Sequence, residues 1–278
     1  HTQELNIEFD YATITKIEDC GATKKLYVEE DPDRVIETKT VIIATGTEHR
    51  RLHVENEDKF IGNGIGFCAI CDGEFYRDKD VVVIGGGNVS MDAVRTARRL
   101  GAKKVSILYR RRVADMTALP AEIEGAVAEG VEVKTLMAPS RIVTDENGRV
   151  SGIYVTPQMI SRIKDGRASV KPTGEEDILV PCQTIIVAIG QDIESKHFAD
   201  AGVPVERGKI MTGKHGGFEN IPGVFAGGDC ASGPASVIKA IAAAKVVAAN
   251  IDEYLGYHHE ITSGVEIPEA SLKDKTPC

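Results

Sequence analysis

The sequence has no apolar run long enough to span a bilayer, no signal peptide at its start and no low-complexity stretch. Nothing in it therefore indicates a membrane protein. Basic residues are also fewer than acidic ones: the sequence has 33 Lys and Arg against 42 Asp and Glu. The resulting net charge of -9 argues against a nucleic-acid partner. The 278 residues, 42% of them hydrophobic and 27% charged, suit a soluble protein of one large or two mid-sized domains.

Cysteine is sparse, and only one pair of the six is closely spaced. This excludes a dense disulfide framework, and no second Cys-x-x-Cys completes a four-ligand zinc site, so no metal is predicted. In Cys68-Ala-Ile-Cys71 the two-residue spacing lets a disulfide close and reopen, and Asp72 is a candidate proton donor or acceptor for the sulfur. The alternatives are inert buried thiols or half of a metal site. A single such pair in an α/β pattern favours cytoplasmic redox chemistry.

The other four cysteines are isolated in the sequence. They are interpreted as core or surface thiols, although Cys230 follows Asp229 closely enough to lie near a cofactor. The four are Cys20, Cys182, Cys230 and Cys278.

A glycine-rich turn joins a predicted strand at 80–85 to a predicted helix at 90–100, and a second strand follows at 104–109. In such a β-α-β unit the first glycine makes the tight turn, the second lets the backbone approach a pyrophosphate, and a small third residue allows close packing. The turn predicts a dinucleotide site, and the alternative is a purely structural turn. Its candidate residues are Gly85, Gly87, Asn88, Val89 and Ser90.

The end of the strand at 104–109 indicates which dinucleotide binds. An NAD site typically has an acidic residue there for the ribose hydroxyls. This sequence instead has Tyr109-Arg110-Arg111-Arg112, and guanidinium groups suit the additional phosphate of NADPH. NADPH is therefore predicted over NADH, with Arg110 and Arg111 favoured over Arg112. The alternative is a solvated basic turn.

Two apolar strands resemble each other, one at 40–46 ending in Ala44-Thr45-Gly46 and one at 184–190. Each follows a predicted antiparallel meander, at 5–29 and at 131–157, which indicates two similar nucleotide-binding domains, one inserted in the other. A strand-to-turn segment ends in Gly228-Asp229 and is followed by a predicted helix at 236–255. The Asp229 carboxylate is a candidate for a ribityl hydroxyl, and the alternative is a helix-capping turn.

Together these residues resemble the low-molecular-weight thioredoxin reductase family. The resemblance implies an α/β fold of two Rossmann-like three-layer domains: an FAD domain at 1–58 and 191–278, interrupted by an NADPH domain at 59–190. It implies that Cys71 receives electrons from the flavin, Cys68 attacks the disulfide of a thioredoxin-like partner, and Asp72 handles the proton. It also implies a homodimer. The family marks are Ala44-Thr45-Gly46, Cys68-Ala-Ile-Cys71-Asp72-Gly73, Val83-Ile-Gly-Gly-Gly-Asn88, Tyr109-Arg-Arg, Ala188-Ile-Gly190 and Gly223-Val-Phe-Ala-Gly-Gly-Asp229.

The sequence departs from that family in three places. The opening G-x-G-x-x-G segment that binds the FAD pyrophosphate is expected before His1, so the FAD domain is incomplete. Residues 109–130 and 233–241 are closer to the glutamate synthase small subunit and its relatives, and the tail at 256–278 runs past the usual end. The alternative function is therefore an NADPH-flavin electron-transfer subunit of that kind.

Overall fold

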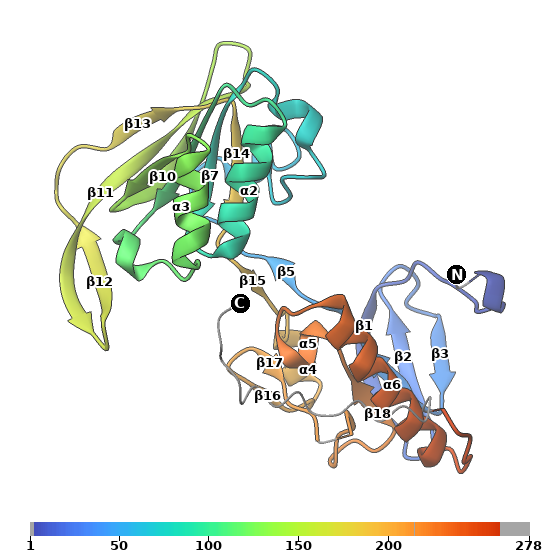
Figure 1. Cartoon of the computed structure of the whole chain (residues 1–278). Helices are drawn as coiled ribbons and strands as arrows, with labels where there is room; N and C mark the ends of the chain where they lie inside the picture. The colour runs from blue at the N-terminus through green and yellow to red at the C-terminus, as the bar shows by residue number, and fades with distance from the viewer. Residues whose placement is uncertain (1–2, 214, 262–278) are drawn as a thin grey trace. The chain divides into compact units, whose positions relative to one another are not determined.

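The computed structural model describes residues 3–213 and 215–261, and the chain forms two compact units (Figure 1). Unit 1 comprises residues 1–48 and 192–278, and unit 2 comprises residues 49–191. The chain passes from unit 1 to unit 2 after residue 48, where Leu52 and Val54 pack against the core of unit 2, and it returns to unit 1 after residue 191.

Unit 2 is built on a five-stranded parallel sheet with α2 (Asn88–Arg99) and α3 (Pro120–Ala128) packed beside it (Figure 1). The predicted β-α-β unit is present as β7, α2 and β8. The segment at 131–136, expected in a meander, instead forms β9 and pairs in parallel with β8. In spatial order the strands are β6 (Ile65–Gly66), β14 (Thr184–Ala188), β7 (Asp80–Gly85), β8 (Lys104–Tyr109) and β9 (Glu132–Thr135).

The apolar run in β7 is continuous because both faces of this sheet are covered. Val81 and Val83 belong to a core cluster with Met91 of α2, whereas Val82 and Ile84 belong to a second cluster with residues of the antiparallel sheet behind. Successive side chains of a strand point to opposite faces, so a strand covered on both sides needs apolar residues at every position. Unit 2 therefore has the predicted three layers.

The third layer of unit 2 is an antiparallel sheet in which β11 (Val150–Lys164) is the longest strand of the described chain. It pairs with β10 (Met137–Thr144), with β12 (Arg167–Pro172) and with β13 (Ile178–Pro181). The predicted strand ended at Pro157, but β11 continues to Lys164 because its second half finds a new partner in β12.

Unit 1 combines an antiparallel meander with a short parallel sheet. The meander is β1 (Ile14–Asp19), β2 (Lys24–Val28) and β3 (Val35–Thr38), while β4 (Val41–Ile43) pairs in parallel with β18 (Val224–Ala226). The strand predicted to begin at Leu5 begins instead at Ile14, because residues 6–13 pair with no strand among the described residues. Helix α6 (Val237–Tyr254) occupies the predicted helical range.

Short elements connect these layers, and no helix in the described ranges is long and apolar enough to cross a lipid bilayer. They are η1 (Gln3–Leu5), β5 (Glu48–His49), α1 (Glu57–Phe60), η2 (Gly73–Tyr76), η3 (Val113–Asp115), β15 (Gln191–Asp192), α4 (Lys196–Asp200), β16 (Val205–Glu206), β17 (Lys209–Ile210) and α5 (Asp229–Ser232).

Candidate redox and nucleotide-binding sites

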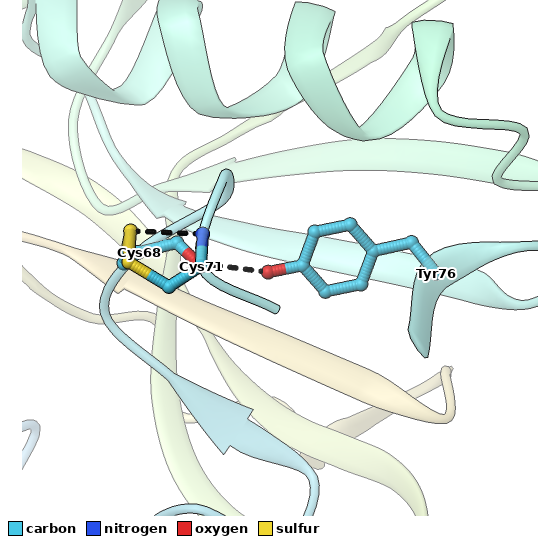
Figure 2. The surroundings of a disulfide bond; sticks show 3 residues. All are labelled: Cys68, Cys71 and Tyr76. Atoms are coloured by element: carbon cyan, nitrogen blue, oxygen red, sulfur yellow. Dashed lines mark hydrogen bonds between the residues drawn. A yellow bond between two sulfur atoms is a disulfide. The ribbon is translucent and has the colours of Figure 1, made fainter. Parts of the chain in front are cut away.

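Cys68 and Cys71 form a disulfide in the loop between β6 and η2, with their Cα atoms 5.4 Å apart (Figure 2). The backbone N–H of Cys71 donates to Cys68 Sγ at 3.1 Å, and the Tyr76 hydroxyl donates to the Cys68 carbonyl at 3.0 Å. Burial, together with the nearby Asp72 charge, raises the pKa of Tyr76 to about 12, so its hydroxyl remains a donor at every physiological pH. The buried Tyr76 side chain thus fixes the backbone of the loop at Cys68.

The surface above the disulfide is open. Cys71 is exposed, Cys68 is half-buried, and the intervening Ile70 is 79% exposed. The disulfide therefore lies in a surface loop of unit 2, beside an exposed apolar side chain.

Asp72 lies immediately after the disulfide and its carboxylate is half-buried. Within the described residues its oxygens accept no hydrogen bond, while a Cβ atom built on Gly66 would lie only 2.7 Å from its Oδ2. Only a glycine at position 66 therefore leaves room for the Asp72 carboxylate beside the end of β6.

The predicted glycine turn brings three elements into direct contact. A Cβ atom at Gly85 would lie 2.2 Å from Ser90 Oγ and 2.3 Å from the Ala188 carbonyl oxygen, and at Gly86 it would lie 2.6 Å from the Tyr109 ring. Ser90 is buried and its hydroxyl donates to the Ala188 carbonyl at 3.1 Å. Only glycines and a small third residue let β7, α2 and β14 approach this closely, as the motif predicts.

The turn leaves the first turn of α2 accessible. Gly87 is its N-cap, and Asn88 and Val89 are exposed at the start of a twelve-residue helix. Their backbone N–H groups have no intrahelical acceptor, which is the arrangement that binds phosphate. The Asn88 side chain has a different role, because its Oδ1 accepts a hydrogen bond from the Leu119 N–H at 2.9 Å.

The three arginines after β8 have separate environments. Arg112 forms a two-pronged ion pair with Asp115, with Nε to Oδ2 at 2.8 Å and Nη2 to Oδ1 at 2.9 Å. Arg110 is exposed, and the Nε of Arg111 is buried without a hydrogen-bond partner. The Arg112 charge is therefore already neutralised by a carboxylate, and Arg110 and Arg111 remain the predicted phosphate ligands.

Asp115 was not singled out in the sequence, although its three-residue spacing from Arg112 was a usable signal. Its side chain is fully buried and also accepts the Ala168 N–H at 2.8 Å. Hydrogen bonds from Arg112 and from the Ala168 backbone hold the pKa of this carboxyl well below its usual range. Asp115 therefore ties the arginine segment to the start of β12.

A cavity of about 550 Å³ in unit 1 brings together predicted flavin-binding residues from two strands. Ala44 and Gly46 follow β4, Gly228 and Asp229 follow β18, and apolar side chains of α6 complete the lining. The volume and the mainly apolar wall with one carboxylate are typical of a cofactor site. Thr45 faces elsewhere and lines a second cavity of about 520 Å³.

Three of the four isolated cysteines lie in the described ranges, and each has a free thiol at the surface or in the core. Cys20 is exposed; Cys182 is buried, and burial next to Asp80 raises the pKa of its thiol to about 12. Cys230 is buried and its Sγ donates to the carbonyls of Ile43 and Gly227, both at 3.3 Å. Cys278 lies outside the described residues. In the part of the chain that is described, no three His, Cys, Asp or Glu side chains gather as a metal site.

Similar proteins agree with this geometry. The model of the pyridine nucleotide-disulphide oxidoreductase family matches residues 1–244. The NADP(+)-dependent formate dehydrogenase subunit beta of Moorella thermoacetica is 35% identical over 229 residues, covering 77% of this chain and 31% of that protein. Thioredoxin reductase of Mycoplasma genitalium is 32% identical over 224 residues, covering 80% and 64%. The structure of Lactococcus lactis thioredoxin reductase in its FR conformation matches with a TM-score of 0.72 and 27% identity, covering 91% and 77%.

The chain belongs to the pyridine nucleotide-disulphide oxidoreductase family. This confirms the predicted α/β class, the resemblance to thioredoxin reductases and the assignment to the oxidoreductases. The chain spans about a third of the length of the formate dehydrogenase subunit and less than two thirds of the Mycoplasma enzyme.

Proposed function

We propose that this chain is the disulfide-bearing part of an NADPH- and FAD-dependent reductase that delivers electrons to a thioredoxin-like protein. The observation that carries the proposal is that an accessible Cys68–Cys71 disulfide and a dinucleotide-type glycine turn occur in the same compact unit. Unit 2 would then be the NADPH domain and unit 1 the FAD domain. A cytoplasmic location and a homodimer belong to the same proposal.

The residues around the glycine turn fit NADPH. The Gly85–Gly87 turn and the exposed start of α2 would hold the pyrophosphate, and Arg110 and Arg111 would hold the additional phosphate. The buried, unpartnered Nε of Arg111 supports this role, because such a donor normally has an acceptor. When bound, NADPH supplies a hydride.

The cavity in unit 1 fits part of a flavin site. Gly228 has a φ of 74°, a conformation that favours glycine, and lets the chain turn sharply so that Asp229 opens α5 at the cavity wall. The Asp229 carboxylate would bind a ribityl hydroxyl and the apolar side chains of α6 would exclude water from the isoalloxazine ring. When bound, FAD passes two electrons at a time.

The chemistry of the chain itself is thiol–disulfide exchange. With both sulfurs reduced, the Cys68 thiolate attacks the partner disulfide, one partner sulfur leaves as a thiolate, and a mixed disulfide forms. Cys71 then attacks Cys68, which releases the second partner sulfur and restores the Cys68–Cys71 disulfide. Two electrons leave for the partner, and Asp72 supplies a proton to a leaving thiolate.

Replacing Cys71 with Ser tests the assignment, and Cys20→Ser is its control because Cys20 is an exposed, isolated cysteine. In the full-length protein that contains this chain, loaded with FAD and supplied with NADPH, thioredoxin reduction should fall at least a hundredfold in Cys71→Ser and should not change in Cys20→Ser. NADPH binding, measured by fluorescence, should be unchanged in both. Cys71→Ser should also accumulate a mixed disulfide with thioredoxin, visible by mass spectrometry. Retained thioredoxin reduction in Cys71→Ser would overturn the proposal.

One observation favours a second candidate, an NADPH-flavin electron-transfer subunit. The 35% identical relative is named as the beta subunit of an NADP(+)-dependent formate dehydrogenase rather than as a disulfide reductase. In that case the disulfide would be dispensable for electron transfer. The double variant Cys68→Ser/Cys71→Ser would then reduce ferricyanide and its companion subunit at the normal rate.

A further inference from the structure

The second half of β11 and the whole of β12 form a hairpin that continues past β10 and β13 in unit 2 (Figure 1). We call residues 158–172 the arm. Its turn is Asp165-Gly166, and both residues have positive φ values, 50° and 77°, the combination that a two-residue hairpin turn requires. The arm is thus a well-formed hairpin rather than an irregular loop.

One face of the arm carries four cations and no acidic residue. Residues directly opposite each other in an antiparallel pair share a face, as do alternate residues along a strand. Lys164 pairs with Arg167, and Arg162 and Lys171 lie on the same side of the hairpin. The six residues of this face are Met159, Arg162, Lys164, Arg167, Ser169 and Lys171.

Nothing within the described chain neutralises this face. The side chains of all four cations lie on exposed residues, and in the described ranges none of them has a carboxylate within ion-pair distance. Lys164 stands directly opposite Arg167, and like charges in that position destabilise a hairpin. The arrangement is unusual in a chain whose net charge is -9. An anionic surface that covered the arm would offset the repulsion among these cations.

The arm is also held in place, which prepares it for binding. The Gly166 carbonyl accepts Arg112 Nη2 at 3.3 Å, and the Ala168 N–H donates to the buried Asp115 carboxylate at 2.8 Å. Ala168 itself is only 2% exposed. The outer edge of β12 is therefore covered near the turn, so another strand cannot pair with it there. A partner would instead contact the cationic side chains.

We infer that the cationic face of the arm is a docking surface for the acidic face of the electron-accepting protein. A small anion could bridge Lys164 and Arg167 but cannot contact all four cations, because Arg167 and Lys171 are about 13 Å apart along the strand. The overall acidity of the chain repels nucleic acid, and Met159 adds an apolar contact that suits a protein surface. The inference rests on the proposed function for the nature of the partner.

The test compares two charge reversals of equal size in unit 2. The arm variant is Arg162→Glu/Lys171→Glu, away from the Asp115 contact, and the control is Lys103→Glu/Arg149→Glu, two exposed cations outside the arm. Each is made in the full chain with Cys68→Ser/Cys71→Ser, so that docking is measured without disulfide exchange. The probe is a fluorescently labelled, oxidised thioredoxin of net negative charge, and affinity is measured by anisotropy at low and at physiological salt.

At low salt the arm variant should bind the probe about tenfold more weakly than the parent, the control should bind within about twofold, and the arm variant should show the shallower salt dependence. Equal weakening in both variants, or in neither, would overturn the inference. It would also fail if arm reversal abolished binding of a DNA duplex but not of thioredoxin, or converted a dimer of the chain to a monomer without affecting the probe. Because these measurements involve no electron transfer, a failed reductase assay does not decide them.

Discussion

The two apolar strands that resemble each other in sequence have opposite surroundings. In unit 2, β14 lies between β6 and β7, and Ile186 at its centre is 1% exposed. In unit 1, β4 pairs only with β18 among the described residues, and Ile42 at its centre is 54% exposed. Ile42 also lines both cavities of that unit. The same sequence pattern thus builds a core in one unit and the wall of a cavity in the other.

This contrast shows what an apolar run establishes and what it leaves open. The run indicates a strand with no polar face, but its burial depends on which elements cover it. In unit 2 the cover consists of α2 and α3 on one side and the β10–β13 sheet on the other. In unit 1 the apolar side chains of β4 and α6 line the cavity of the candidate flavin site, which explains why they are exposed to solvent.

The largest expected effect separates these two isoleucines. Ile186→Ala should lower the free energy of unfolding of unit 2 by about 3 to 4 kcal/mol, because it removes a fully buried side chain and leaves a cavity. Ile42→Ala should cost less than about 1 kcal/mol, because most of the side chain is already in contact with solvent. Denaturant unfolding followed by far-ultraviolet circular dichroism measures both. Equal losses would show that β4 is packed as tightly as β14.

The next effect concerns two carboxylates in ion pairs, Asp115 in unit 2 and Glu18 in unit 1. The Asp115 side chain is fully buried, whereas the side chains of Glu18 and its partner Lys16 are both more than a third exposed. Asp115→Asn should therefore lower the Tm of unit 2 by roughly 5 °C, with a smaller decrease of unit 1 stability for Glu18→Gln. Calorimetry of each variant against the parent measures the difference.

The pH dependence of that difference has a definite sign. The pKa of Asp115 is lowered in the folded chain, so its ion pair stabilises the fold above the pKa of an unfolded Asp, about 4. The stabilisation is lost as the pH falls towards the lowered folded pKa. The Tm gap between the parent and Asp115→Asn should therefore be constant from pH 7 to pH 5 and should narrow below about pH 4. A gap that widens on acidification would contradict this assignment.

Asp115 also illustrates what the sequence could not reveal. The β-α-β unit, the disulfide pair and the glycine turn are encoded within short windows, so periodicity and spacing predict them. The hydrogen bond between Asp115 and Ala168 joins residues 53 positions apart, and no local sequence pattern predicts such a contact. The arm was missed for another reason, because the register shift between Ile160 and Arg162 interrupts the alternation in β11, and Ala168 and Val170 alone are too few apolar residues to mark β12 as a strand. The boundary after residue 48 likewise depends on long-range packing.

The smallest expected effect compares two tyrosine hydroxyls. In unit 2 the buried Tyr76 hydroxyl holds the Cys68 carbonyl, and Tyr76→Phe should cost about 1 kcal/mol of stability because it leaves that carbonyl without its phenol donor. In unit 1 the Tyr27 hydroxyl donates to Glu18, a partly exposed carboxylate that water can solvate instead. Tyr27→Phe should therefore produce no resolvable change.

The functional consequence distinguishes the two tyrosines further. Without its hydroxyl, Tyr76 no longer fixes the loop that carries the disulfide, so Tyr76→Phe should slow thioredoxin reduction several-fold while leaving NADPH affinity unchanged. Tyr27→Phe has no such link to the sulfur atoms and should reduce thioredoxin at the parent rate. Steady-state kinetics with thioredoxin, alongside NADPH titration, separates the two outcomes. A Tyr76→Phe chain with normal kinetics would show that the backbone contact from Cys71 to Cys68 Sγ alone positions the disulfide.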